Sequence, residues 1–205
     1  SGETVIAGMG ELHLDIYIQR MRREFKACVT VGAPNVSYRE APTREAGFNY
    51  RHKKQTGGSG QFAHVVGRLI PLDADAVDPY EFEDNVTGGR IPREYIPAVS
   101  KGFVAAMEKG PLAGYPIVGC KMALDDGSYH NVDSSEMAFR TAGKAAFREA
   151  FNKSKPCLQE PLMTVEVETP AEFQGSLVGD LNSRRGMILS TEARESYTVI
   201  RAEVP

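Results

Sequence analysis

We expect the fold to be organised around one polar stretch, Asp126-Gly127-Ser128-Tyr129-His130-Asn131-Val132-Asp133-Ser134-Ser135-Glu136. In residues 115–124, just before it, apolar side chains at alternate positions from Val118 to Leu124 predict a strand. A helix is expected to begin at Asp133, whose carboxylate can cap the first turn while Glu136 reaches back. The loop between them is then short and polar, and it would present Ser128, Tyr129, His130 and Asn131 outward for contact.

Composition narrows the classes of protein that this chain can belong to. Its 205 residues allow one large or two small domains, and an apolar content of 41% is enough for a packed core. The net charge of -3 gives no global field, so an RNA site would have to be a local basic surface. The three cysteines are far apart and form no CxxC pair, which disfavours structural zinc and disulfides and suits a reducing cytoplasm. No signal peptide or spanning apolar run is present, so no membrane partner is expected.

The middle of the chain shows strand and helix patterns in an α+β order. Strands are predicted over 36–40, 46–54, 62–72 and 80–86, and a helix over about 97–109. That helix should turn Val99, Phe103, Ala106 and Met107 inward, and the helix after the polar stretch should bury Phe139, Ala146, Phe147, Ala150 and Phe151.

Each flank of the chain reads as an incomplete βαβ piece. The first has a strand over 3–7, a helix from Gly8-Met9-Gly10 to about Phe25 and a strand over 28–31. The face of this helix carries Leu14, Ile18, Met21 and Phe25. A boundary follows at 32–34 and a linker at 153–161. The second has strands over 162–168, 187–192 and 196–203, with a helix over about 170–185 that Gly186 ends.

The hairpin predicted between 46 and 72 has a basic stem and a glycine-rich tip. Arg51, Lys53 and Lys54 lead into Gly57-Gly58-Ser59-Gly60-Gln61, with no acidic residue from 51 to 61. The tip lacks the lysine of a nucleotide-binding loop, so it is either a plain hairpin turn or a site of RNA backbone contact. Arg184 and Arg185 also have two possible roles. They can interact with the dipole at a helix end, or they can bind phosphates.

An enzymatic interpretation competes at the polar stretch. His130 with Ser134 or Ser135 and Asp133 could suggest a hydrolase, but the chain has no G-x-S-x-G turn, and helix capping is a simpler use for Asp133 and one serine. The histidines and cysteines share no metal-ligand spacing. We therefore assign no catalytic and no metal residues, and expect His130 and Asn131 to contact a polymer.

Six motifs together resemble bacterial translation elongation factor G. They are Gly8–Leu14, Gly57–Phe62, Gly88–Pro97, Gly110–Pro116, Gly127–Glu136 and Gly179–Gly186, and they cover the chain in order. The resemblance implies that 1–33 is the end of domain III, 34–158 is domain IV and 159–205 is the start of domain V. It also implies a central domain similar to the second domain of ribosomal protein S5, flanked by partial ferredoxin-like pieces. The chain would then be a fragment, which its start without Met also suggests.

The resemblance carries a function with it. The full-length factor would be a GTPase whose GTP and Mg²⁺ lie in a domain absent from this chain, so the fragment itself would be no enzyme and hold no cofactor. Domain IV would enter the decoding site of the ribosome and contact the tRNA–mRNA duplex during translocation. By motif match, the contacting loops are Gly58, Ser59, Gly60 and Gln61, and Ser128, Tyr129, His130, Asn131 and Asp133.

Two other roles stay open within the same family. One is a paralogue that acts in ribosome recycling, and the other is a ribosomal protection protein. The truncated sheets at both ends would also leave unpaired edges, which can pair with each other or with a neighbouring chain, or stay mobile.

Overall fold

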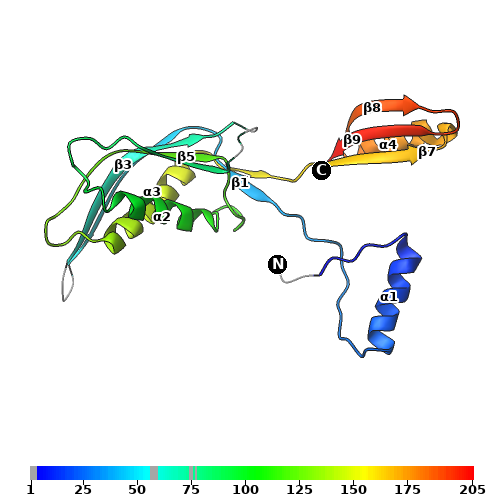
Figure 1. Ribbon diagram of the computed structural model, residues 1–205, viewed down its shortest axis with the longest axis horizontal. Helices are drawn as coiled ribbons and strands as arrows, with labels where there is room; N and C mark the ends of the chain where they lie inside the picture. Colours follow the sequence, from blue (N-terminus) through cyan, green and yellow to red (C-terminus); the bar gives the residue numbers. More distant parts are fainter. Residues whose placement is uncertain (1–3, 56–59, 74–75, 77) are drawn as a thin grey trace. The chain divides into compact units, whose positions relative to one another are not determined.

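The computed structural model describes residues 4–55, 60–73, 76 and 78–205, and shows a mixed α/β chain with several sheets (Figure 1). The chain divides into two compact units, 1–36 and 37–205. No helix in the described part is long and apolar enough to cross a membrane.

The described residues of the first unit, 4–36, form a single helix with irregular flanks. Helix α1 spans Glu11–Arg23, and Ile18 on its predicted face is buried. Phe25, predicted to be inward, is 74% exposed because the helix ends two residues before it. The strands predicted over 3–7 and 28–31 are wrong for the described residues 4–7 and 28–31. A strand needs a partner for its backbone amides, and no strand of the described sheets comes from this unit.

The central part of the second unit is a four-stranded sheet covered on one face by two helices (Figure 1). The strand order is β2-β3-β5-β4, and β4 and β5 are the parallel pair, joined through α2. The elements are β2 (Ala46–Lys54), β3 (Gln61–Pro71), β4 (Tyr80–Asp84), α2 (Ile96–Met107), β5 (Cys120–Ser128) and α3 (Glu136–Lys153).

The core between the sheet and the helices follows the predicted periodicity. Every side chain predicted to be inward on α2 and α3 is buried, which confirms those two helix faces. Phe103 on α2 contacts Phe48 of β2 and Phe147 of α3, with ring centroids 5.7 Å and 6.4 Å away. Buried aromatic rings of this kind supply much of the hydrophobic stabilisation of a core.

Strand β5 lies further along the chain than the prediction of 115–124. It continues to Ser128 because β3 is long enough to pair with it up to His64. The register shifts between Val66 and Gly67, where Asp125 of β5 is the extra residue of a β-bulge. The contact loop is therefore shorter than predicted and begins at Tyr129.

The second unit also contains a short two-stranded sheet next to its central part. β1 (Arg39–Ala41) pairs with β6 (Cys157–Gln159), a strand that we had expected to be linker. Glu40 of β1 is fully buried, and its carboxylate accepts hydrogen bonds from the four backbone amides of residues 112–115. Gly110 is required beside it, because a Cβ there would collide with this carboxylate.

The end of the chain forms its own small α/β layer. β7 (Met163–Thr169), β8 (Met187–Ala193) and β9 (Thr198–Val204) lie in the order β7-β9-β8. The predicted strands are confirmed to within two residues. The predicted helix consists of a 3₁₀ turn (η1, Ala171–Phe173) and α4 (Gln174–Ser183). Leu181 of α4 packs against Ile200, Ala202 and Val204 of the sheet.

Candidate nucleic-acid interface

The two predicted contact loops meet at one end of the central sheet. Phe62, at the start of β3, donates its backbone amide to the carbonyl of Asp133 (2.8 Å). The Ser134 hydroxyl donates to the carbonyl of Phe62 (2.7 Å). We call the described part of this region, residues 60–62 and 129–134, the tip. The two segments are 72 residues apart in sequence at this contact, so only the fold brings them together.

One hydroxyl fixes the backbone of the second loop as well. The His130 amide donates to Ser134 Oγ (2.9 Å), and the Ser134 amide donates to the carbonyl of His130 (3.1 Å). The rings of His130 and Phe62 lie in contact, with centroids 6.2 Å apart. Ser134 therefore couples His130 to the hairpin that carries Gln61.

The orientation of the His130 ring sets its hydrogen-bonding character. Nδ1 accepts from the amides of Asp133 (3.1 Å) and Val132 (3.3 Å), so it carries no proton in this arrangement. The Asp133 carboxylate is 3.6 Å from the same nitrogen, but that ion pair would need a proton on Nδ1. With Nδ1 accepting these amide hydrogen bonds, the ring N–H is at Nε2. The half-exposed side chain of His130 then offers an N–H donor to a ligand.

The helix cap differs from the prediction. Helix α3 begins at Glu136, and Ser135 is its N-cap, with Oγ accepting from the amide of Ala138 (3.2 Å). The expected cap at Asp133 is wrong because the backbone of Asp133 is paired with β3 instead. Ser134 and Ser135 thus both have structural partners, and neither hydroxyl contacts the His130 ring. A hydrolase would need a serine hydroxyl activated by the His130 ring, and neither Ser134 nor Ser135 forms that pair.

The remaining predicted residues differ in their exposure to solvent and in their hydrogen-bond partners. Tyr129 and Asn131 are exposed at the tip, whereas Ser128 is half-buried at the end of β5, where its hydroxyl contacts His64. Gln61 Oε1 accepts from His52 Nε2 (2.9 Å), which leaves its NH₂ group for a ligand. A Cβ on Gly60 would lie 2.8 Å from the Asp133 carboxylate, so a side chain at this position would require that carboxylate to move. Gly58 and Ser59 lie outside the described residues.

The basic stem lies on the edge strand beside the tip. Arg51, Lys53 and Lys54 are exposed on β2, and Lys54 pairs in register with Gln61. Within the part of the chain that the structure describes, none of these three has an acidic group within ion-pair distance. Their charges are therefore available to an anionic ligand.

Arg184 and Arg185 already have acidic partners. Arg184 pairs with Asp180 (2.9 Å), and Arg185 binds both carboxylate oxygens of Glu160 (2.7 and 2.8 Å). Hydrogen bonding to Arg185 lowers the pKa of Glu160, which keeps that carboxylate charged. Phosphate contact by these two arginines stays a prediction, and it would require competition with these acids.

A histidine network that sequence reasoning missed supports the sheet behind the tip. His64 Nε2 donates to Asn49 Oδ1 (2.8 Å), and the Ser128 hydroxyl donates to His64 Nδ1 (3.0 Å). Burial and the nearby Arg51 lower the pKa of His64, so its neutral form is favoured. The alternation of β3 could have placed His64 on the open face, but its partners depend on strand pairing.

The described residues contain no cluster of three or more His, Cys, Asp or Glu that could hold a metal ion. The tip has amide and imidazole donors, and the adjoining strand β2 adds the ammonium groups of Lys53 and Lys54. Such donors suit sugar hydroxyls and phosphates, which need no base-specific geometry.

Comparison with known proteins gives the family. Three family models cover almost the whole chain: "Elongation Factor G, domain III" matches residues 1–33, "Elongation factor G, domain IV" matches 34–155 and "Elongation factor G C-terminus" matches 157–205. Elongation factor G of Rhodopirellula baltica is 59% identical over all 205 residues, and elongation factor G 1 of Syntrophus aciditrophicus is 54% identical.

A crystal structure of a Thermus thermophilus protein matches 97% of this chain with a TM-score of 0.85 and 40% identity, and the match covers 29% of that protein. The chain spans 30% and 29% of the length of the two curated relatives. Because the domain IV model alone matches more than half of the chain, we conclude that the chain belongs to the elongation factor G family.

Proposed function

We propose that this chain is the RNA-contacting part of a translational GTPase that promotes tRNA–mRNA translocation on the ribosome. Residues 1–33, 34–158 and 159–205 would be the end of domain III, domain IV and the start of domain V. The central domain would be S5-like and its flanks ferredoxin-like. GTP and Mg²⁺ would bind in a separate domain, and this part would contribute no catalytic residue.

The observation that carries the proposal is the joined tip. Ser134 connects the loop of His130 to the strand of Gln61, so a fixed N–H donor and a side-chain amide lie on one rigid end. Lys53 and Lys54 add positive charge on the adjoining strand. Gln61, His130, Asn131 and Tyr129 would contact the sugar–phosphate backbone of the codon–anticodon duplex. These contacts do not depend on base identity, which a factor that serves every codon requires.

The test uses the full-length factor with Gln61→Ala, His130→Ala and both together. We expect each single change to slow translocation about five- to tenfold, because a lost hydrogen bond is worth about 1 kcal/mol. GTP hydrolysis on the ribosome should persist. Both rates are measured by stopped flow on the same ribosomes.

His130→Gln serves as the matched control, because its side-chain amide can restore an N–H donor. It should recover part of the loss seen with His130→Ala. Translocation at the normal rate in the double variant would refute the proposal. A selective loss of ribosome splitting after termination would instead favour the recycling role.

A further inference from the structure

A row of cations lies along the seam between α2 and α3, on the helix layer of the central domain. Arg140, Lys144 and Arg148 follow one another four residues apart on α3, and all three are exposed. Lys109 is exposed just after the end of α2, and it lines the same pocket as Arg148. We call these four residues the seam cations.

The seam cations have no acidic partners. Within the described ranges, none of the four has a carboxylate within 4.0 Å, whereas Arg68, Arg184 and Arg201 each form an ion pair. Glu136, at the start of the row, is within 3.7 Å of Lys101. Two further acids are next to the row in sequence: Glu108, which is exposed, and Glu149, which pairs with Lys153 (2.6 Å). In a chain with a net charge of -3, the seam is therefore a local positive surface.

Without a bound ligand, the row of cations on α3 is unfavourable for the stability of that helix. Like charges at positions i and i+4 lie on the same side of a helix and repel each other, which destabilises it. An anionic ligand along the row would remove this repulsion. The spacing is regular, about 6 Å from one cation to the next along the helix axis.

The two helices pack closely against each other beside the row of cations. A Cβ on Gly143 would lie 2.6 Å from the carbonyl oxygen of Val99, and a Cβ on Gly102 would collide with the backbone of Arg140. Glycine at both positions allows this approach, while the cationic side chains of the row are exposed.

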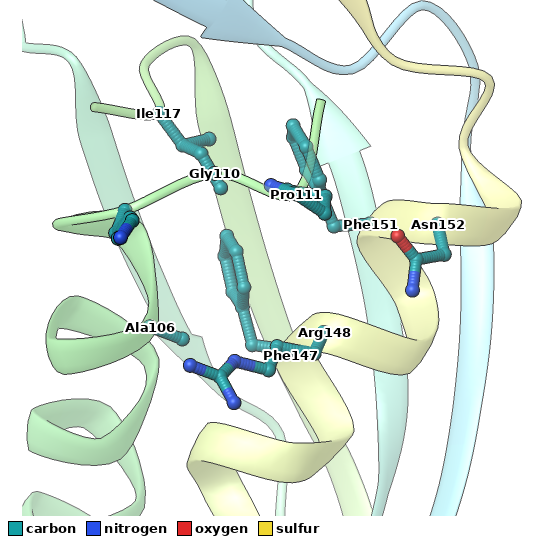
Figure 2. A pocket seen from close by; sticks show the side chains of 9 residues that line it. Ala106, Gly110, Pro111, Ile117, Phe147, Arg148, Phe151 and Asn152 are labelled. Carbon is teal, nitrogen blue, oxygen red and sulfur yellow. The ribbon is translucent and has the colours of Figure 1, made fainter. Parts of the chain in front are cut away.

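A depression lies at the end of the seam, and Figure 2 shows it. Its volume is about 300 Å³, and Lys109, Arg148 and Asn152 contribute its polar groups. Phe147 and Phe151 of α3 lie opposite Pro111 and Ile117 (Figure 2). No acidic residue lines it. An anionic group held by Lys109 and Arg148 would meet no carboxylate there, and Asn152 could donate to it through its NH₂ group.

We propose that the seam cations bind an RNA sugar–phosphate backbone, as a second RNA-contacting surface that begins beside the tip and runs away from it. This inference rests on the proposed function only in taking RNA as the partner. Rows of Arg and Lys without acids are the electrostatic signature of backbone binding. An acidic protein partner would require an apolar centre in the interface, and the two helices expose only Val104 on α2 and Met137 on α3 as large apolar side chains.

The experiment measures binding of the 205-residue chain to a short mixed-sequence RNA duplex over a range of KCl concentrations. The triple variant Arg140→Gln/Lys144→Gln/Arg148→Gln is compared with Arg68→Gln/Arg194→Gln/Arg201→Gln, which changes the net charge equally at exposed arginines that have acidic partners. The slope of log K against log[KCl] should fall by about one for each phosphate that is no longer neutralised, so by about three in the seam variant. The control variant should keep the wild-type slope.

The outcomes separate this proposal from the proposed function. A seam variant with the same slope as the control, or no RNA binding by the wild-type chain, overturns the inference, even if the variant loses affinity for an acidic peptide. Gln61→Ala/His130→Ala in the same assay reports on the tip alone. Weaker binding by the seam variant with no change in the tip variant supports the seam and counts against the tip. Thermal unfolding should show the seam variant to be no less stable than wild type, since it removes like-charge pairs.

Discussion

At the scale of single residues, the tip depends on Ser134 more than on the side chains that would contact RNA. Its hydroxyl donates to Phe62 and accepts from the amide of His130, so it links two segments through one atom. His130 can present Nε2–H outward only while Nδ1 faces the amides of Val132 and Asp133. Ser134 thus positions the donor that His130 presents.

We expect Ser134→Ala to release the second loop from β3. Two hydrogen bonds are removed, and the stability of the central domain should fall by about 1–2 kcal/mol. The ¹⁵N chemical shifts of the His130 ring, measured by NMR, should move toward those of a mixture of tautomers, because the loop no longer holds Nδ1 against its amides. Translocation by the full-length variant should slow as in His130→Ala.

Ser135→Ala is the matched control for this change. It removes the N-cap of α3 and should cost about 1 kcal/mol of stability, yet leave the His130 ring shifts unchanged. Ser134→Thr retains the hydroxyl and should restore the wild-type spectrum. Unaltered His130 shifts in Ser134→Ala would show that the loop holds its shape without this bond.

At the scale of elements, the contact between α2 and α3 requires glycine on both helices. Gly102 faces the backbone of Arg140 and Lys144, and Gly143 faces Val99. Helix propensity alone would favour alanine at either position by about 1 kcal/mol. The close helix contact therefore requires glycine where helix propensity alone would favour alanine. The same contact fixes the position of the seam cations.

We expect Gly102→Ala to destabilise the central domain by about 1–3 kcal/mol, because the added methyl forces the helices apart. Chemical denaturation followed by circular dichroism measures the change. Ala105→Gly in the same helix reports the propensity contribution at a position with more room, and should cost about 1 kcal/mol with no effect on packing. A more stable Gly102→Ala variant would contradict the close helix contact.

At the scale of the whole molecule, the described residues form two separate hydrophobic cores. One lies between the four-stranded sheet and its helices, and the other between α4 and the three-stranded sheet. Both belong to the second compact unit, but no residue is a member of both cores. Separate cores can unfold separately, since cooperativity follows shared burial.

We expect Ile200→Ala and Leu124→Ala to act on different parts of the chain. Each side chain is fully buried, and each change should cost about 2–5 kcal/mol in its own core. Hydrogen exchange read by mass spectrometry should show reduced protection in β7–β9 for the first variant and in β2–β5 for the second. Equal effects in both parts from either variant would mean that the two cores unfold as one.

The sequence alone determined the class of the fold, the family and most of its elements. Periodicity identified the buried faces of α2 and α3, and the strands from β2 onward apart from the short β6, because these patterns are local and repeat within one element. The motifs around Gln61 and His130 marked both segments of the tip. The prediction for Phe25 was wrong because α1 ends at Arg23. The predictions of strands at 4–7 and 28–31 and of a cap at Asp133 were wrong because each depends on the partner that lies opposite the residue.

Only the tertiary structure decided how these segments are joined. Several contacts join residues that are far apart in the chain. They are the bond from Ser134 to Phe62, the pairing of β1 with β6, the bulge in β5 and the network of His64. Periodicity states which side of a strand is buried, but not which partner lies across from it. That choice depends on the register of whole strands and on the packing of the helices against them, which no short stretch of sequence contains.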